Sequence, residues 1–209
     1  MKYHKLTENA EKPQGFWGRL MIRSMNKGHS DLTDWALGYI KFENGMRVLD
    51  VGCGGGRTVS KLCGMVGSGK VYGIDYSDLC VQKSLKANKK NVLCGKADIR
   101  KASVSELPFE NESFDLVTAV ETYYFWPDKL HDLTEIRRVL RSGGKLLLVF
   151  EMLKSEENPD RWKAVEERLN IKAVSSGEIN EMLLRAGYQN IRIHIRHDEG
   201  RLCAIAEKE

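Results

Sequence analysis

A glycine-rich loop directly after a short apolar segment is the feature that most constrains how this chain folds. The run Val48-Leu49-Asp50-Val51 is followed at once by Gly52-Cys53-Gly54-Gly55-Gly56. The apolar run has the length of a buried strand, and the residues after the loop, through Val66, have helical spacing. Glycines at such a turn let the backbone bend tightly and let a ligand approach the helix N-terminus. The loop therefore predicts an α/β fold with a binding site at this turn.

The rest of the chain continues to alternate between strand-like and helix-like segments. The further expected strands lie at 71–75, 92–94 leading to 97–98, 114–120, 145–150, 191–195 and 202–206. Strands near Val48, Val117 and Leu147 are continuously apolar, as parallel strands buried on both faces are. The last two flank a turn at 198–201 and read as an antiparallel hairpin. We expect a mostly parallel sheet covered by helices on both faces.

Composition limits the classes of protein that remain. The 209 residues fit one domain with a small appendage, which we place at 1–43, an arm and a helical segment, before a domain at 44–209. Five widely spaced cysteines favour reduced thiols, and no metal-ligand spacing is present. No apolar run resembles a secretory signal or a membrane span, so we expect a cytoplasmic protein. The net charge of +4 is weak evidence for a nucleic-acid partner.

Three carboxylates accompany the loop and narrow the ligand class. Asp50 precedes the glycines, Asp75 ends the expected second strand, and Asp98 is expected to end the third. A carboxylate at the end of the second strand is placed to accept both hydroxyls of a ribose. The third glycine of a dinucleotide fingerprint is replaced by Arg57, and no P-loop is present. An adenosine with an amino-acid tail fits better than a dinucleotide, and a nicotinamide oxidoreductase stays open as a rival.

These residues resemble the class I S-adenosylmethionine-dependent methyltransferases, most closely their type 11, quinone-biosynthesis-like group that acts on small molecules. Five motifs occur in order over roughly residues 45–152: 48–56, 71–77, 96–99, 114–117 and 140–146. The resemblance implies a Rossmann-like three-layer α/β sandwich. It implies a seven-stranded, mostly parallel sheet with a C-terminal antiparallel hairpin strand. It also implies an N-terminal helical lid.

The resemblance also implies roles for residues of the site. The cofactor would be S-adenosyl-L-methionine, with S-adenosyl-L-homocysteine as product. Asp50, Gly52 and Gly54 would shape the site for the methionine end, Asp75 would hold the ribose, and Asp98 with the Ile99 backbone would contact the adenine. The expected cofactor-binding set is Asp50, Gly52, Cys53, Gly54, Gly56, Asp75, Tyr76, Asp98, Ile99 and Glu121.

Candidates for proton handling are fewer. His29, Glu121 and Tyr124 are the expected catalytic residues if the acceptor must lose a proton, and His131 is a weaker one. The aromatic run 123–126 is open to two interpretations, packing in the core or a wall beside a cationic sulfur.

The predicted function is methyl transfer by direct displacement to an unidentified small molecule. The Asn/Asp-Pro-Pro-Tyr motif of amino-methylating nucleic-acid enzymes is missing after the expected fourth strand, where Glu121-Thr122-Tyr123-Tyr124 stands. A small-molecule substrate is therefore expected, with no nucleic acid and no membrane span, in a monomer or homodimer. The alternatives are a non-catalytic protein that binds the cofactor and an RNA or protein methyltransferase.

Overall fold

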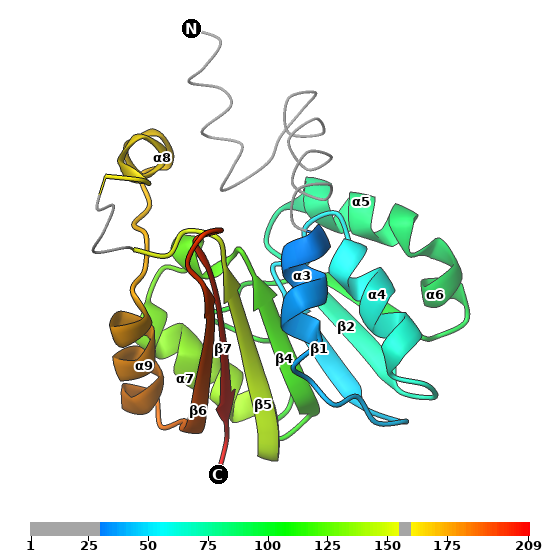
Figure 1. The fold of residues 1–209 in the computed structure, drawn as a ribbon. Coiled ribbons are helices and arrows are strands. Elements are labelled where there is room, and N and C mark those ends of the chain that lie inside the picture. The colour runs from blue at the N-terminus through cyan, green and yellow to red at the C-terminus, as the bar shows by residue number, and fades with distance from the viewer. Residues whose placement is uncertain (1–29, 155–159) are drawn as a thin grey trace, which may run out of the picture.

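A seven-stranded sheet forms the centre of the computed structural model, which describes residues 30–154 and 160–209 (Figure 1). Its strand order is β3-β2-β1-β4-β5-β7-β6. The strands are β1 (Arg47–Val51), β2 (Lys70–Asp75), β3 (Ala97–Lys101), β4 (Phe114–Val120), β5 (Leu140–Phe150), β6 (Gln189–Arg196) and β7 (Arg201–Glu207). β1 to β5 pair in parallel, and β7 is antiparallel to β5 and β6. The predicted sheet and hairpin are confirmed.

Helices connect and cover the strands. They are α3 (Ser30–Leu37), α4 (Arg57–Met65), α5 (Asp78–Ala87), α6 (Lys89–Leu93), α7 (Lys129–Val139), α8 (Lys163–Leu169) and α9 (Ser176–Arg185). Local capping explains several starts. The Ser77 hydroxyl accepts the Cys80 N–H at the start of α5, and the Ser175 and Glu178 side chains form a capping box at α9.

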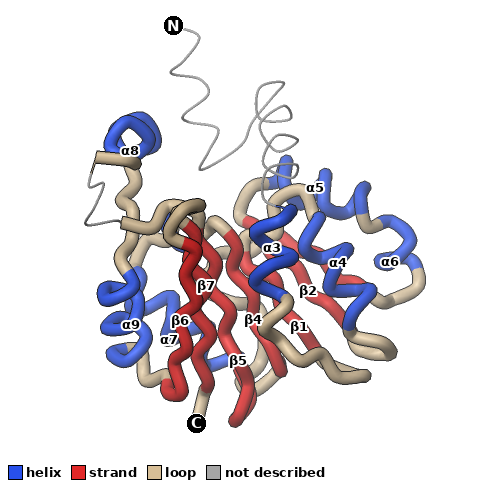
Figure 2. Tube along the Cα trace, in the orientation of Figure 1, coloured by secondary structure: helices blue, strands red, loops and turns tan. Residues whose placement is uncertain are grey.

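Helices cover both faces of the sheet (Figure 2). An apolar layer lies on each of these faces. Successive residues of β1 enter different layers, because side chains alternate along a strand. Val48 packs with α3 and α4, whereas Leu49 packs in the layer of α7 and α9. Each fully buried leucine or isoleucine stabilises the fold by about 1.5–3 kcal/mol relative to exposure. A sheet buried on both faces explains why its strands are continuously apolar.

The sheet order places the glycine loop at a switch point. β1 lies between β2 and β4: the chain runs outward from β1 to β2 and β3, and then crosses to β4 on the other side of β1. Ligands of open parallel sheets bind beyond the carboxyl ends of the strands at such a point. We call the edge of the sheet where the parallel strands end the carboxyl edge. Within residues 30–154 and 160–209, no helix has the length and apolarity needed to cross a bilayer.

Two interpretations of the sequence are corrected by the fold. Residues 92–94 were expected to be a strand, but 92 and 93 belong to α6 and β3 starts only at Ala97. A short apolar run has no periodicity that separates strand from helix. The glycine pair Gly143-Gly144 is typical of a helix end, but α7 ends at Val139 and both glycines lie within β5.

The N-terminal segment is covered only in part. The lid expected at 1–43 falls mostly outside the described residues, as does His29. The described part, α3, buries Leu32 and Ala36 completely in the layer that also holds Val48 and Leu147. α3 therefore belongs to the packing of the sheet domain, and the division at residue 43 stays a prediction.

Candidate functional site

The three glycines of the loop have positive φ for different structural reasons. Their φ values are 70° for Gly52, 52° for Gly54 and 80° for Gly56. A Cβ on Gly52 would lie 2.9 Å from Cβ of Thr122, and one on Gly56 would lie 2.8 Å from Cα of Ser84. A Cβ on Gly54 would have only the Gly52 carbonyl oxygen near it, at 4.0 Å. Two glycines thus allow close packing of the protein, and Gly54 faces open space.

Asp75 ties the glycine loop to the end of β2. Its carboxylate accepts hydrogen bonds from the backbone N–H groups of Gly54 and Ser77, each at 2.9 Å. The side chain is buried, and burial raises its pKa while the two backbone donors lower it. A carboxylate has about four lone-pair sites, so these two bonds leave acceptor capacity for ligand hydroxyls.

The carboxylate of Asp50 is buried, and only one of its two oxygens accepts a hydrogen bond. Oδ1 accepts the Thr118 hydroxyl at 2.7 Å, whereas Oδ2 has no hydrogen-bond partner among the described residues. Burial raises the pKa of Asp50 to about 7, against the opposing effect of the Thr118 hydrogen bond. A buried acceptor without a partner is costly, so it is a place where a ligand donor would bind favourably.

These features fit the two ends of S-adenosylmethionine that the sequence predicts. The open face at Gly54 and the unpartnered Asp50 oxygen suit an amino-acid end, because a cationic amine would compensate the buried carboxylate. Asp75 suits a ribose, and Tyr76, which is 37% exposed, follows it directly in sequence. The residues at this site therefore fit S-adenosylmethionine.

The side chain of Cys53 is buried in the interior of the protein. Its N–H donates to the Ile74 carbonyl at 2.9 Å, and its thiol lies 3.7 Å from the Ser84 hydroxyl. Burial raises the pKa of the thiol well above its ordinary value. The side chain thus packs the loop against α5, and only its backbone lies in the glycine loop.

The prediction that Asp98 ends the third strand is wrong. Asp98 is the second residue of β3 and lies three positions before Lys101, which pairs with Asp75 at the carboxyl edge. At about 3.3 Å per residue this puts it about 10 Å from that edge. Its carboxylate bonds both nitrogens of the Arg100 fork, which lowers its pKa. Ile99 is also interior to β3, with its side chain in the apolar layer.

Glu121 and Tyr124 join the chain after β4 to the chain after β5. Glu121 has a φ of 57°, rare for a residue with a side chain, and its Oε1 accepts the Glu151 N–H at 2.5 Å. The Tyr124 hydroxyl accepts the Met152 N–H at 3.0 Å and also bonds Glu121. Burial, reinforced by the Glu151 charge, raises the pKa of Glu121 to about 8. This pair forms a polar, proton-holding group at the carboxyl edge.

The sequence did not point to several residues of this edge. Thr118 orients Asp50, and Arg201 at the start of β7 contacts Glu151 at 3.5 Å. Thr118 stands opposite Asp50 because β1 and β4 pair in that register. Arg201 is near β5 because the hairpin folds back along it. Neither pairing has a local sequence signal.

The aromatic run 123–126 is mostly core. Tyr123, Tyr124 and Trp126 are buried, and Tyr123 and Tyr124 contact the Phe150 ring edge-on at centroid distances of 5.5 and 5.6 Å. Phe125 is only partly buried. Packing explains three of the four rings.

Comparison with known proteins also points to a methyltransferase. A family model described as a methyltransferase domain matches residues 49–148. The chain is 31% identical over 134 residues to the 27-O-demethylrifamycin SV methyltransferase of Amycolatopsis mediterranei, covering 64% of this chain and 48% of that one. It is 42% identical over 106 residues to the demethylmenaquinone methyltransferase of Staphylococcus aureus, covering 49% and 42%. The chain thus spans about half the length of these curated relatives.

Solved structures show the same fold. A SAM-dependent methyltransferase from Aquifex aeolicus superposes with a TM-score of 0.74 at 22% identity, covering 90% of this chain and 97% of that one. The phosphoethanolamine N-methyltransferase 2 of Haemonchus contortus, solved with S-adenosyl-L-methionine, has a TM-score of 0.73 at 16% identity, with 86% and 52% covered. With its glycine loop, its strand order and the family model that matches residues 49–148, the chain contains a methyltransferase domain similar to the class I S-adenosylmethionine-dependent methyltransferases of the type 11 group.

Proposed function

We propose that this protein transfers a methyl group from S-adenosylmethionine to a small-molecule acceptor by direct displacement. The observation that carries the proposal is the arrangement of Asp50, Gly54 and Asp75 at the switch point of the sheet. It provides an unpartnered buried acceptor, an open stretch of backbone and a carboxylate at the end of the second strand. These are the groups that an adenosine with an amino-acid tail requires.

Each of these residues has a distinct proposed role. Asp50 binds the amine of the methionine end, Gly54 leaves room for the cofactor backbone, and Asp75 accepts the ribose hydroxyls while holding the loop in place. Because Asp98 lies away from the carboxyl edge, the adenine contact is better supplied by the residues that follow Lys101. Ala102 is the first of them, and its N–H donates to the Asp75 carbonyl.

The chemistry asked of the chain is mainly orientation. S-adenosylmethionine, when bound, supplies a methyl group attached to a positively charged sulfur. The leaving group therefore needs no acid, and the site must hold the acceptor atom in line with the methyl group. Such positioning is worth about 7–11 kcal/mol of an activation barrier.

Glu121 and Tyr124 are the proposed proton-handling groups for an acceptor that loses a proton. Both lie at the carboxyl edge, and the raised pKa of Glu121, about 8, is close to a working pH. We expect Glu121→Gln to lower kcat for a phenol acceptor at least tenfold while leaving S-adenosylhomocysteine affinity unchanged. A parallel loss of affinity would assign Glu121 to the cofactor site instead.

The acceptor class is proposed from the relatives. Several are named as O-methyltransferases, one acts on demethylmenaquinone, and two on phthiotriol or phenolphthiotriol dimycocerosates. A hydroxyl or ring carbon of a small apolar molecule is the acceptor we favour. We further propose that no nucleic acid is needed and that the protein works in the cytoplasm as a monomer or homodimer.

The decisive experiment follows a labelled methyl group. The full chain is incubated with methyl-labelled S-adenosylmethionine and a panel of phenols, hydroquinones, alcohols and amines, and products are identified by mass spectrometry. Transfer to a panel member supports the proposal. Tight S-adenosylhomocysteine binding with no transfer to any class would favour the non-catalytic alternative. Thermal stabilisation by NAD(P) and not by S-adenosylhomocysteine would overturn the proposed cofactor.

A further inference from the structure

A basic surface lies on α5 and α6, which pack beside the edge strand β3. Between Asp78 and Asp98 the sequence has five lysines and no acidic residue. They are Lys83, Lys86, Lys89, Lys90 and Lys96. This segment therefore has a net charge of +5, in a chain whose net charge is +4.

Three of these lysines have no structural partner that explains them. Lys86 in the last turn of α5 and Lys89 and Lys90 in α6 are exposed, and none forms an ion pair with a described residue. Lys96 differs, because its ammonium donates to the Gly67 carbonyl. Elsewhere on the surface, lysines such as Lys154 are matched by acids, here Glu178.

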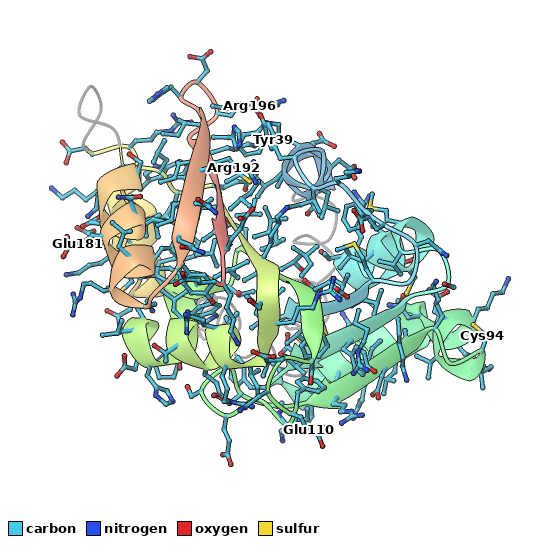
Figure 3. The ribbon with its side chains drawn as sticks, turned by 90° about the horizontal axis from the view of Figure 1, so that it is seen from below. Tyr39, Cys94, Glu110, Glu181, Arg192 and Arg196 are labelled. Carbon is cyan, nitrogen blue, oxygen red and sulfur yellow. The ribbon has the colours of Figure 1, made fainter. Side chains whose placement is uncertain are left out.

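Apolar side chains stand among these charges. Leu93 is 76% exposed and Leu85 is 36% exposed. Leu93 follows Lys89 by four residues in the same helix, so the two side chains share one face. We call Leu85, Lys86, Lys89, Lys90 and Leu93 the lysine–leucine surface. Cys94, the next residue, marks its place at one extremity of the molecule (Figure 3).

The chemistry of this surface selects one kind of partner. A second copy bound through a two-fold axis would bring lysines against lysines. Surfaces that bind single-stranded nucleic acid combine basic residues with stacking aromatic rings, and no aromatic residue lies between Asp78 and Asp98. Lysines with intervening leucines are typical of helices that lie in an anionic membrane interface, where ammonium groups meet lipid headgroups and leucines enter the acyl boundary.

We propose that the lysine–leucine surface docks the protein reversibly on anionic bilayers. The contact involves no span: α6 lies against the headgroups, with Leu93 and Leu85 inserted and the three lysines around them. This interaction is independent of methyl transfer, so its failure would leave the proposed function untouched.

Vesicle co-sedimentation tests the proposal with the full chain. We expect binding to phosphatidylcholine vesicles that contain phosphatidylglycerol, no binding to pure phosphatidylcholine, and loss of binding as salt is raised. The triple variant Lys86→Gln, Lys89→Gln, Lys90→Gln should bind about a hundredfold more weakly, about fivefold for each lysine. Leu93→Ser should weaken binding about tenfold.

Matched controls separate a specific surface from general charge. The triple variant Lys41→Gln, Lys172→Gln, Arg185→Gln changes the net charge equally at exposed positions elsewhere. Leu184, which is 57% exposed on α9, gives the control Leu184→Ser. We expect both controls to bind vesicles like the wild type. Equal losses in the two triple variants, or no vesicle binding by the wild type, would overturn the proposal.

Cys94 offers a second readout at the same place. It is the exposed cysteine of five, and the other four are buried. An environment-sensitive fluorophore on Cys94 should shift to the blue with anionic vesicles and stay unchanged with pure phosphatidylcholine. A response to single-stranded RNA, without any response to vesicles, would overturn membrane docking and assign the surface to nucleic acid.

Discussion

At the scale of single residues, Asp75 links the architecture of the site to ligand binding. Its carboxylate fixes the loop through the N–H groups of Gly54 and Ser77, and the same oxygens are the proposed acceptors for ribose hydroxyls. The role of Asp75 could be predicted from its place at the end of an apolar run. Its bond to Gly54 could not, because that depends on how β1 and β2 lie side by side.

We predict that Asp75→Ala weakens S-adenosylhomocysteine binding at least tenfold, since lost hydrogen bonds to a charged group cost about 1.5–3 kcal/mol each. Isothermal titration measures the affinity, and circular dichroism checks that the fold is kept. Asp78→Ala is the matched control, because Asp78 is exposed and pairs only with Lys101 at 2.7 Å among the described residues. Unchanged affinity in Asp75→Ala would refute the ribose assignment.

Asp50 predicts a pH dependence of cofactor binding. Its pKa is raised from 3.8 to about 7, mainly by burial, so the carboxylate is the minor form below pH 7. A cationic amine needs the charged form, and affinity should fall about tenfold from pH 8 to pH 6. The same raised pKa makes the stability of the unliganded protein depend on pH. The free energy of unfolding falls as pH rises from about 4 to 7, because Asp50 ionises at lower pH in the unfolded chain than in the folded one. Titrations with S-adenosylhomocysteine measure the first effect, and a flat profile in the wild type would contradict it.

At the scale of elements, the glycine loop joins β1, α4 and α5 into one unit. The Asn88 amide donates to the Gly56 carbonyl at 2.8 Å and to the Ser84 carbonyl at 3.1 Å. This holds the N-terminus of α4 against the end of α5. The glycine pattern could be predicted to be a turn, but which glycine faces a ligand and which faces α5 depends on helices that are distant in sequence.

The loop yields a contrast between two alanine variants. We predict that Gly56→Ala lowers the free energy of unfolding by about 2–4 kcal/mol, because its Cβ meets Ser84 at a positive φ. Gly54→Ala should cost only about 1–2 kcal/mol of backbone strain, yet weaken S-adenosylhomocysteine binding more than tenfold. Urea unfolding and ligand titration of both variants give the comparison. Equal effects on stability would show that the two glycines are equivalent.

At the scale of the whole molecule, both apolar layers share one sheet. β1, β4 and β5 contribute residues to each layer, so neither layer can open without exposing the other. α3 is part of this unit, because Leu32 and Ala36 are completely buried.

Removal of residues 1–29 tests the predicted lid. We expect the shortened chain to unfold in a single calorimetric transition and to bind S-adenosylhomocysteine within a few-fold of the full chain. Methyl transfer should fall at least tenfold, because the expected lid and His29 are absent. Full activity of the shortened chain would remove both from the catalytic assignment.

The sequence by itself indicated the resemblance to methyltransferases, most of the strands and helices, and the place of the glycine loop, because these depend on local spacing and turn chemistry. Only the tertiary structure decided the position of Asp98, the partners of Asp50 and Glu121, and the core packing of three of the four aromatic rings at 123–126. Strand register and side-chain contacts join residues that are far apart in the chain. Asp50 and Thr118, for example, are 68 positions apart, and no local pattern connects them.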